Sequence, residues 1–167
     1  LIVALLIPIG VAFADTEYCC GVSYSTVKDE NGNYESAFKQ FKTNQEYKDY
    51  VNTVIKDKHL ESYTVDIYSG DFDVIIKKAQ SIYINGNNNN ITLSSHSVVL
   101  EKGSVELIIF NGCKLTGDYE FTIRYGCSLH IANRSIYDGL NRTYTHDIFN
   151  LEQGGRLQID NSYIQDS

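Results

Sequence analysis

The chain has 167 residues, which is enough for one domain with a buried core. Its formal net charge is −7 at pH 7, and its isoelectric point is near 5.0. A surplus of carboxylates repels phosphate groups, so this charge argues against nucleic acid or an anionic membrane surface as a partner.

The first 14 residues, LIVALLIPIGVAFA, form an apolar run that ends in Ala12-Phe13-Ala14. This pattern is typical of a secretory signal peptide with a small-x-small cleavage site, and it predicts a mature chain from Asp15. A membrane-spanning helix needs about 20 residues, so we expect no transmembrane segment here. No basic region precedes the run, and we interpret the signal peptide as incomplete at its start. An exported protein is secreted or held at the cell surface.

Residues 15–42 predict an extended N-terminal region with a short β-hairpin. Polar and apolar residues alternate in VSYSTVKDENGNYESAF, residues 22–38, on both sides of Asn31-Gly32. Alternation of this kind is typical of strands with one buried face, and Asn-Gly is a strong hairpin-turn signal. We therefore expect two antiparallel strands joined at this turn.

Residues 43–72 are expected to hold a helix and a lead-in strand. Thr43 and Glu46 have the spacing of a capping box, which marks the start of a helix. The apolar residues that follow recur at helical spacing, which predicts an amphipathic helix over about residues 44–58. Its apolar face consists of Tyr47, Tyr50, Val51, Val54 and Ile55.

From residue 73 to residue 167 one pattern occurs four times. The copies read VIIKKA-QSIYINGNNNNI from position 74, VVLEKG-SVELIIFNGCKL from 98, FTIRYG-CSLHIANRSI from 121 and FNLEQG-GRLQIDNSYI from 149. Their corner residues, Ala79, Gly103, Gly126 and Gly154, lie 24, 23 and 28 residues apart. A period of this length is typical of a solenoid, in which each unit buries its apolar face only by stacking on its neighbours.

Five columns of the aligned repeats contain only aliphatic residues or phenylalanine. Because side chains alternate between the two faces of a strand, we expect these columns to fill one interior, with the polar residues between them facing outward. The columns are Val74, Val98, Phe121 and Phe149; Ile76, Leu100, Ile123 and Leu151; Ile82, Leu107, Leu129 and Leu157; Ile84, Ile109, Ile131 and Ile159; and Ile91, Leu115, Ile136 and Ile164.

One polar column supports this alignment independently, and a second marks a corner of the coil. Stacked parallel strands lie about 4.8 Å apart, so charges of alternating sign in one column would attract each other. One column holds such charges: Lys77, Glu101, Arg124 and Glu152. Asparagine tolerates the left-handed backbone of a sharp corner, and its amide can bond the next coil. A second column holds Asn111, Asn133 and Asn161, with Asn87 or Asn88 in the first repeat.

The chain resembles right-handed parallel β-helix proteins of the pectin-lyase-like superfamily, and most of all archaeal adhesin-like surface proteins. The resemblance is carried by the G-x-x-L-x-I-x-N coils and by the segment SIYINGNNNNITL. The resemblance extends over roughly residues 40–167. It implies an all-β fold, a right-handed parallel β-helix solenoid of about four coils. The N-terminal helix would cap the open end of the first coil. The last coil has no such cover, so we expect the natural protein to continue beyond Ser167.

The same resemblance implies a non-enzymatic, adhesin-like protein without a cofactor, which binds a glycan or protein partner or acts as a surface stalk. A scaffold module of a larger assembly is a third possibility. Because the superfamily also contains polysaccharide lyases and glycoside hydrolases, a carbohydrate-active enzyme is the alternative function. Its acid pair would be Asp138 and Asp166, which follow the last apolar column in adjacent coils, with Asp118 near the same place one coil earlier. The other interpretation is that these aspartates are solvated turn residues without a catalytic role.

The third repeat carries an insertion, DGLNRTYTH at residues 138–146. Insertions in solenoids project from one face, where binding residues are often found. The candidate binding residues are Tyr137, Arg142, Tyr144 and His146, because they can stack on a sugar ring or hydrogen-bond its hydroxyls. The insertion also contains a glycosylation sequon at Asn141. A second sequon lies at Asn90, and a third at Asn133, which we expect to be bare because it forms a corner.

The cysteines and histidines predict no metal site. Adjacent Cys19 and Cys20 lack the spacing of zinc ligands, and the four histidines have no metal-binding pattern. His130 stands between two interior positions, so we expect it to face solvent. Export allows disulfides, but four cysteines permit three pairings, and the sequence does not choose between them. Cys113 and Cys127 fall in different columns, so we expect no bridge between them.

Overall fold

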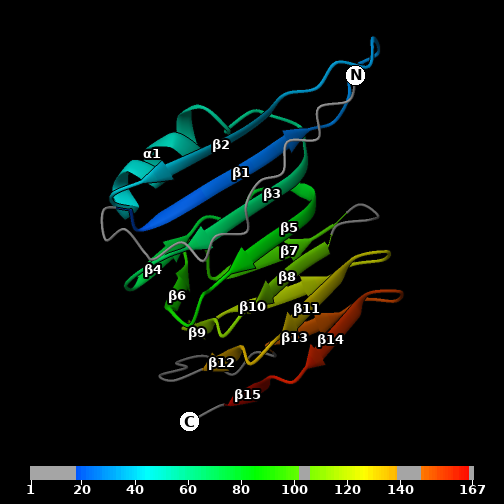
Figure 1. Cartoon of the computed structure of the whole chain (residues 1–167). Coiled ribbons are helices and arrows are strands. Elements are labelled where there is room, and N and C mark those ends of the chain that lie inside the picture. The colour runs from blue at the N-terminus through cyan, green and yellow to red at the C-terminus, as the bar shows by residue number, and fades with distance from the viewer. Residues whose placement is uncertain (1–17, 102–105, 139–147, 166–167) are drawn as a thin grey trace, which may run out of the picture.

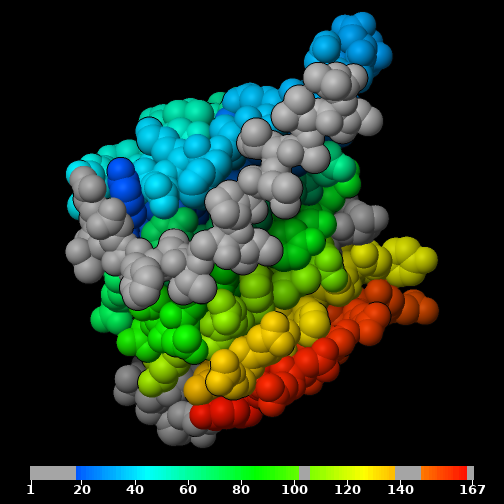
Figure 2. Space-filling model, viewed as in Figure 1, coloured from blue at the N-terminus to red at the C-terminus, as the bar shows by residue number. Residues whose placement is uncertain are grey.

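The computed structural model describes residues 18–101, 106–138 and 148–165 (Figure 1). This part of the chain is mostly β-structure and forms a parallel β-solenoid of about four turns. In the space-filling view the turns follow one another as bands of colour, from the N-terminal hairpin to the last strand (Figure 2). The predicted all-β, coiled architecture is therefore confirmed.

Each complete turn contributes one strand to each of three sheets. The first turn contains β3 (Leu60–Ile67) and β4 (Phe72–Val74), and the second contains β5 (Ala79–Asn85), β6 (Asn90–Leu93) and β7 (Ser97–Leu100). The third contains β8 (Glu106–Phe110), β9 (Lys114–Thr116) and β10 (Glu120–Ile123). The fourth contains β11 (Ser128–Ala132), β12 (Ile136–Asp138) and β13 (Phe149–Leu151), followed by β14 (Arg156–Asp160) and β15 (Tyr163–Gln165).

The three sheets differ in length because the first turn and the N-terminal hairpin do not contribute to all of them. The long sheet has seven strands in the order β14-β11-β8-β5-β3-β1-β2, where β1 is Cys20–Thr26 and β2 is Ser36–Phe41. The five-stranded sheet has the order β15-β12-β9-β6-β4, and the three-stranded sheet has the order β13-β10-β7. All neighbours are parallel except β1, which is antiparallel to both β2 and β3.

The predicted interior columns of the long sheet are confirmed residue by residue. Leu107 pairs with Ile82 on one side and Leu129 on the other, and Leu129 pairs with Leu157. The column that starts at Ile84 keeps the same register. These side chains are buried in the inner turns because each turn covers the apolar row of the next.

The first repeat departs from the predicted alignment. The predicted pairing of Val74 with Val98 is wrong, because Val74 lies in β4 of the five-stranded sheet and pairs with Leu93. Residues 75–78 form no strand. The physical reason lies in the helix, since the hydroxyl of Tyr47 accepts the backbone N–H of Ile75 at 2.9 Å. The three-stranded sheet therefore begins only at β7.

A second correction concerns the last apolar column. Tyr137, not Ile136, occupies the interior position and pairs with Leu115 and Ile164. Ile136 is half-buried and pairs with Lys114. The tyrosine ring is held inside by neighbouring aromatic rings, which lie 6.1 to 6.3 Å from it: Tyr119, Phe121 and Phe149.

The charge column forms a ladder on the surface. Arg124 lies between two carboxylates, with Nη1 2.7 Å from Glu101 Oε2 and Nε 3.3 Å from Glu152 Oε1. In the first repeat the ladder is completed by Lys78, whose Nζ lies 3.3 Å from Glu101 Oε1, and not by the predicted Lys77. Lys77 instead donates to a backbone carbonyl at residue 56. The difference follows from the missing strand at residues 75–78.

The asparagine corner is confirmed. Asn87, Asn111, Asn133 and Asn161 all have positive φ, at 45°, 64°, 54° and 47°. The amide of Asn111 donates to Oδ1 of Asn87 at 2.7 Å, and the amide of Asn87 donates to the backbone carbonyl of Ile67 at 2.9 Å. The N–H after each of the first three asparagines donates to the carbonyl of the next one, at 2.8 to 3.0 Å. Asn87 is thus the first member of the column.

The single helix among the described residues, α1, spans Asn44–Thr53 and has the predicted capping box. It ends earlier than the predicted residue 58. Its buried side chains face the hairpin and the first turn, where the ring of Tyr47 lies 5.0 Å from that of Phe72. The side-chain amide of Asn44 donates to the carbonyl of Asp73 in β4 at 3.0 Å. Side chains of α1 therefore bond backbone groups in and just after β4, an edge strand of its sheet.

The interior and exterior faces of β8 give a matched test of this packing. Ile109→Ala removes a buried side chain, so it should lower the free energy of unfolding by about 2–5 kcal/mol. Ile108→Ala, on the outward face of the same strand, should cost less than about 1.5 kcal/mol because that side chain is already partly exposed. Urea denaturation followed by circular dichroism measures both. Equal losses would contradict the inward assignment of Ile109.

Candidate functional site

Only one residue of the predicted acid pair lies among the described residues. Asp138 pairs with Thr116 in the preceding turn and with Gln165 in the following one. Asp166 lies outside the described residues, and Asp118 is half-buried between β9 and β10. Hydrolysis by a carboxylate pair needs both groups to face one glycosidic bond. The pair of Asp138 and Asp166 therefore stays a prediction.

One residue of the predicted binding loop, Tyr137, is buried. Tyr137 is 0% exposed, so its assignment to an exposed glycan-binding loop is wrong. Its hydroxyl donates to the carbonyl of Gly117 at 3.0 Å and accepts the backbone N–H of Tyr119 at 3.2 Å. The other predicted members of the loop, Arg142, Tyr144 and His146, and the sequon at Asn141 lie outside the described residues.

The sequon at Asn90 lies on the surface at the start of β6. Its side chain is exposed, and its amide donates to Oδ1 of Asp71 at 2.9 Å. The third sequon residue, Thr92, donates through its hydroxyl to Oδ1 of Asp73 at 3.2 Å. Glycosylation at Asn90 would replace the first of these hydrogen bonds.

His130 faces outward, as predicted, and it has a partner. Its Nε2 lies 2.9 Å from Oδ2 of Asp160 on the neighbouring turn. The same carboxylate oxygen accepts from the amide of Gln158 at 2.6 Å. These two donors, Gln158 first and then His130, hold the pKa of Asp160 below its ordinary value. Asp160 is therefore a carboxylate at neutral pH.

The cysteines are free thiols in the structure. Burial raises the pKa of Cys20 and Cys113 well above the ordinary value, and it also raises the pKa of Cys19. The thiolate is the reactive and metal-binding form, so these three side chains are not activated nucleophiles. Cys127 is also buried.

Two further observations concern sites of other kinds. Within the ranges that the structure describes, no group of three or more His, Cys, Asp or Glu side chains is placed to hold a metal ion. Among the same residues no helix has the length and hydrophobicity needed to cross a membrane.

A polar surface lies on the outward side of β4, β6 and β9 in the five-stranded sheet, and we call it the polar face. Two register pairs define it, Asn90 with Lys114 and Asp73 with Thr92. Asp71 joins them through its hydrogen bond to Asn90, and Thr116 lies beside them. Neighbouring columns on one strand are two residues apart, and neighbouring strands are about 4.8 Å apart. The polar face is thus a regular grid of donors and acceptors.

Asp73 organises one end of the polar face. Its carboxylate accepts from the hydroxyls of Thr92 and Ser94 at 3.2 and 2.9 Å, and Lys48 of α1 is bound to it at 2.5 Å. A shallow depression of about 230 Å³ lies beside this network, lined in part by Asn90 and Lys114. The side chain of Asp73 is therefore fixed by Thr92, Ser94 and Lys48.

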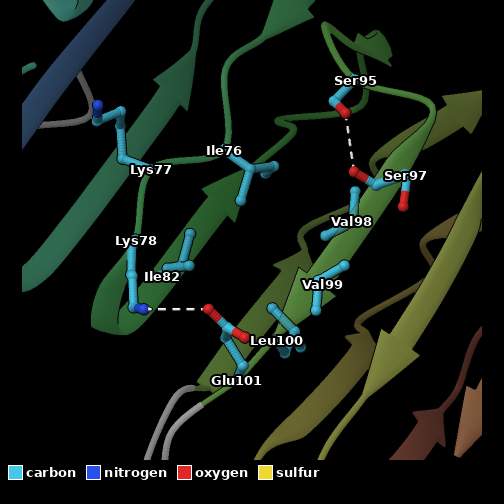
Figure 3. Close-up of a pocket in the computed structure, with 10 residues that line it drawn as sticks. All are labelled: Ile76, Lys77, Lys78, Ile82, Ser95, Ser97, Val98, Val99, Leu100 and Glu101. Carbon is cyan, nitrogen blue, oxygen red and sulfur yellow. Dashed lines mark hydrogen bonds and ion pairs between the residues drawn. The ribbon is translucent and has the colours of Figure 1, made fainter.

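A second hollow lies along the outer edge of β7, and we call it the β7 cleft (Figure 3). It has a volume of about 220 Å³. Ile76 and Ile82 line its apolar side, while the ion pair between Lys78 and Glu101 closes one end (Figure 3). The cleft exists because residues 75–78 form no strand beside β7. An exposed strand edge of this kind is able to accept an extended peptide.

The polar face was within reach of the sequence but is not among the predicted sites. In the first two repeats a polar residue stands on either side of the last apolar column, in N-I-T at residues 90–92 and K-L-T at residues 114–116. Strict alternation places both flanking residues on the outside of the solenoid. The aspartates Asp71 and Asp73 precede the first aligned column, and only the pairing of β4 with β6 brings them into the grid.

Comparison with known proteins found no relative of this chain. The sequence matches no protein-family model, no curated protein and no solved structure. The solenoid is established by its own strand pairing, and the resemblance to pectin-lyase-like and archaeal adhesin-like proteins stays a prediction.

The burial of Tyr137 gives a direct test of its role. Tyr137→Ala should lower the free energy of unfolding by about 3–5 kcal/mol, because it empties an aromatic interior position. The matched control is Tyr125→Ala, which removes a ring that is 77% exposed and should change stability by no more than about 0.5 kcal/mol. Chemical denaturation followed by circular dichroism measures both variants. If Tyr137→Ala lowers the free energy of unfolding as little as the control does, the ring is not buried, and its assignment to the surface loop is favoured.

Proposed function

We propose that the protein is a non-enzymatic, adhesin-like solenoid, secreted or held at the cell surface, that binds a glycan on its polar face. The observation that carries the proposal is the grid of hydrogen-bonding side chains on the five-stranded sheet. The apolar run at residues 1–14 supports export. A right-handed winding is part of the proposal, supported by the strong preference of parallel crossovers for that hand.

The chemistry of the grid suits sugar hydroxyls, which both donate and accept hydrogen bonds. Asp71 offers carboxylate acceptors, Lys114 offers ammonium donors, and Thr92 and Thr116 offer hydroxyls that do both. Farther along the column of Lys114 lies Tyr163, which pairs with Ile136 and is exposed. An exposed tyrosine ring provides an apolar surface for the face of a sugar together with a polar hydroxyl.

Preorganisation favours binding at this surface. β6 and β9 each lie between two neighbouring strands, and Asp73 in the edge strand β4 is held by three side chains. A ligand that binds such a surface loses less free energy to ordering of side chains than one that binds a flexible loop. The polar face also crosses three successive turns through β4, β6 and β9, which suits a polymeric ligand.

We infer that the N-terminal hairpin and α1 cap the solenoid. β1 pairs with β3 and so continues the long sheet past the first turn. Asn44 and Tyr47 bond backbone groups of Asp73 and Ile75 in and next to β4. Uncovered strand edges invite aggregation, and both contacts reduce the exposed edge.

The proposal is tested with a panel of acidic and neutral polysaccharides, measured by calorimetry and by release of reducing sugar. At least one polysaccharide should bind, and Asn90→Ala and Lys114→Ala should each weaken its binding about tenfold, the equivalent of one lost hydrogen bond of about 1.4 kcal/mol. The matched control is Lys28→Ala, which removes an exposed lysine near the hairpin turn and should leave binding unchanged.

Two outcomes would contradict the proposal. If no polysaccharide binds, or if Lys28→Ala weakens binding as much as Lys114→Ala, the polar face is not the binding surface. Release of reducing sugar by the wild-type protein would contradict a non-enzymatic function and favour the carbohydrate-active alternative.

A further inference from the structure

The outer edge of β7 directs backbone groups into the β7 cleft. β7 is the outermost strand of the three-stranded sheet, with β10 on its other side. The N–H of Arg124, just after β10, donates to the carbonyl of Leu100 at 3.0 Å. In a parallel ladder every second residue bonds to the same neighbour. The N–H and C=O of Val99 therefore point away from β10 and into the cleft, where no strand pairs with them.

The cleft has the shape for one extended chain. β7 forms one wall, and the chain at Ile76, Lys77 and Lys78 forms the other (Figure 3). Its volume of about 220 Å³ exceeds that of an engineered cavity of about 150 Å³ that binds benzene, so an aliphatic side chain fits inside. The edge of a folded sheet would bring a second strand against the opposite wall. A single peptide segment therefore suits the cleft better than a second copy of the chain.

The end of the cleft near Glu101 is basic. Beyond Lys78 lies a second hollow of about 520 Å³, which we call the basic hollow. Its charged and titratable lining residues are three lysines, one histidine and one aspartate: Lys56, Lys58, Lys78, His59 and Asp57. Among the described residues, no carboxylate forms a salt bridge with Lys56 or Lys77. In a chain of net charge −7, this local surplus of positive charge favours a ligand with carboxylates.

We propose that the β7 cleft binds the C-terminal segment of a partner polypeptide, extended and parallel to β7, with acidic residues at its end. Two aliphatic side chains of the segment point inward beside Val98 and Leu100, and the residue between them points outward beside Val99. The acidic end leaves the cleft past Lys78 and enters the basic hollow. The parallel direction places carboxylates beside the lysines, whereas the opposite direction would place a terminal ammonium there.

The main-chain contacts of the segment are made by Val99. Its N–H donates to the carbonyl of the first aliphatic residue, and its C=O accepts the N–H of the second. In strand addition such main-chain bonds supply affinity, and pockets for alternate side chains supply specificity. The site is independent of the proposed glycan binding, because the polar face lies on β4, β6 and β9.

The ion pair at the basic end can exchange partners when the segment binds. Glu101 Oε1 lies 3.3 Å from Nζ of Lys78, and Glu101 Oε2 lies 2.7 Å from Nη1 of Arg124. Glu101 therefore keeps one cation when Lys78 turns to the carboxylate of the ligand. The side chain of Lys78 is 62% exposed, and exposed ion pairs contribute little stability. Opening this end of the cleft thus requires little free energy.

The probe for this site is the synthetic peptide STVTVGEE, labelled at its N-terminus and free at its C-terminus, and binding is followed by fluorescence anisotropy. Saturable binding is expected. Replacing both glutamates by glutamine and amidating the C-terminus should raise the dissociation constant at least about tenfold, because the lysines lose their partners. The reversed peptide EEGVTVTS has the same composition but an acidic N-terminal end, and it should bind at least about tenfold more weakly than the probe.

Ester substitutions in the probe test the main-chain register. An ester oxygen in place of the N–H of the second valine removes the donor to the carbonyl of Val99 and should weaken binding about tenfold. The same change at the threonine between the valines is the matched control, because that N–H points away from β7, and it should leave binding unchanged. On the protein, Val99→Pro removes the N–H that faces the cleft and should weaken binding with circular dichroism unchanged, since Val99 does not bond to β10.

Lysine variants separate this site from the polar face. Lys56→Ala and Lys78→Ala should each weaken binding of the probe several-fold, and more strongly at low salt. Lys114→Ala, on the polar face, is the matched control and should leave binding of the probe unchanged. Conversely, Lys78→Ala should leave polysaccharide binding unchanged, so a failure here is distinguishable from a failure of the proposed glycan binding.

Three results would overturn the proposal. Absence of saturable binding by the probe would show that the cleft does not take such a peptide. Equal affinity for the probe and the reversed peptide would contradict the role of the basic end. Equal losses from the two ester substitutions, or a loss at the threonine alone, would refute the parallel register with Val99.

Discussion

Stacking of each turn on the next is the constraint on which the whole molecule depends. One turn is a ribbon of three short strands whose apolar side chains point inward, and it has neither a covered interior nor paired backbone groups by itself. The neighbouring turns supply both. The exposure of the isoleucine column makes the dependence visible, because Ile109 is buried between two turns while the equivalent Ile159 in β14 is partly exposed.

The same repetition that fills the interior organises the surface. Parallel stacking brings equivalent residues within reach of one another, so an asparagine at the corner bonds to the asparagine of the next turn. It also places Arg124 between Glu101 and Glu152. Exposed ion pairs of this kind add little stability, but they reinforce the register. The polar face follows from the same rule, since a stacked repeat turns any outward side chain into a row.

The two ends of the described solenoid differ in their strand pairing. Near the N-terminus the hairpin reverses direction and runs antiparallel to the first turn, while α1 replaces a missing strand contact with the hydroxyl of Tyr47. At the other end of the described residues, β13, β14 and β15 are the outermost strands of their sheets, and all three run parallel to their neighbours.

Much of this fold was predictable because the evidence is periodic. The columns that start at Ile82 and Ile84 were correctly aligned from aliphatic residues alone, and the charges of Glu101, Arg124 and Glu152 supported the alignment independently. The errors fall where periodicity is ambiguous. Ile75-Ile76 does not alternate, so the sequence cannot say which residue belongs to a strand.

The sequence by itself determined that four copies of one motif stack in parallel, because apolar residues at a period of two require a shared interior. Only the tertiary structure decided that Tyr137 points inward in place of Ile136, since in a three-residue strand either neighbour satisfies the alternation. The aromatic rings around Tyr137 settle that choice. The pairing of β4 with β6, and with it the polar face, is likewise a long-range contact that no local pattern encodes.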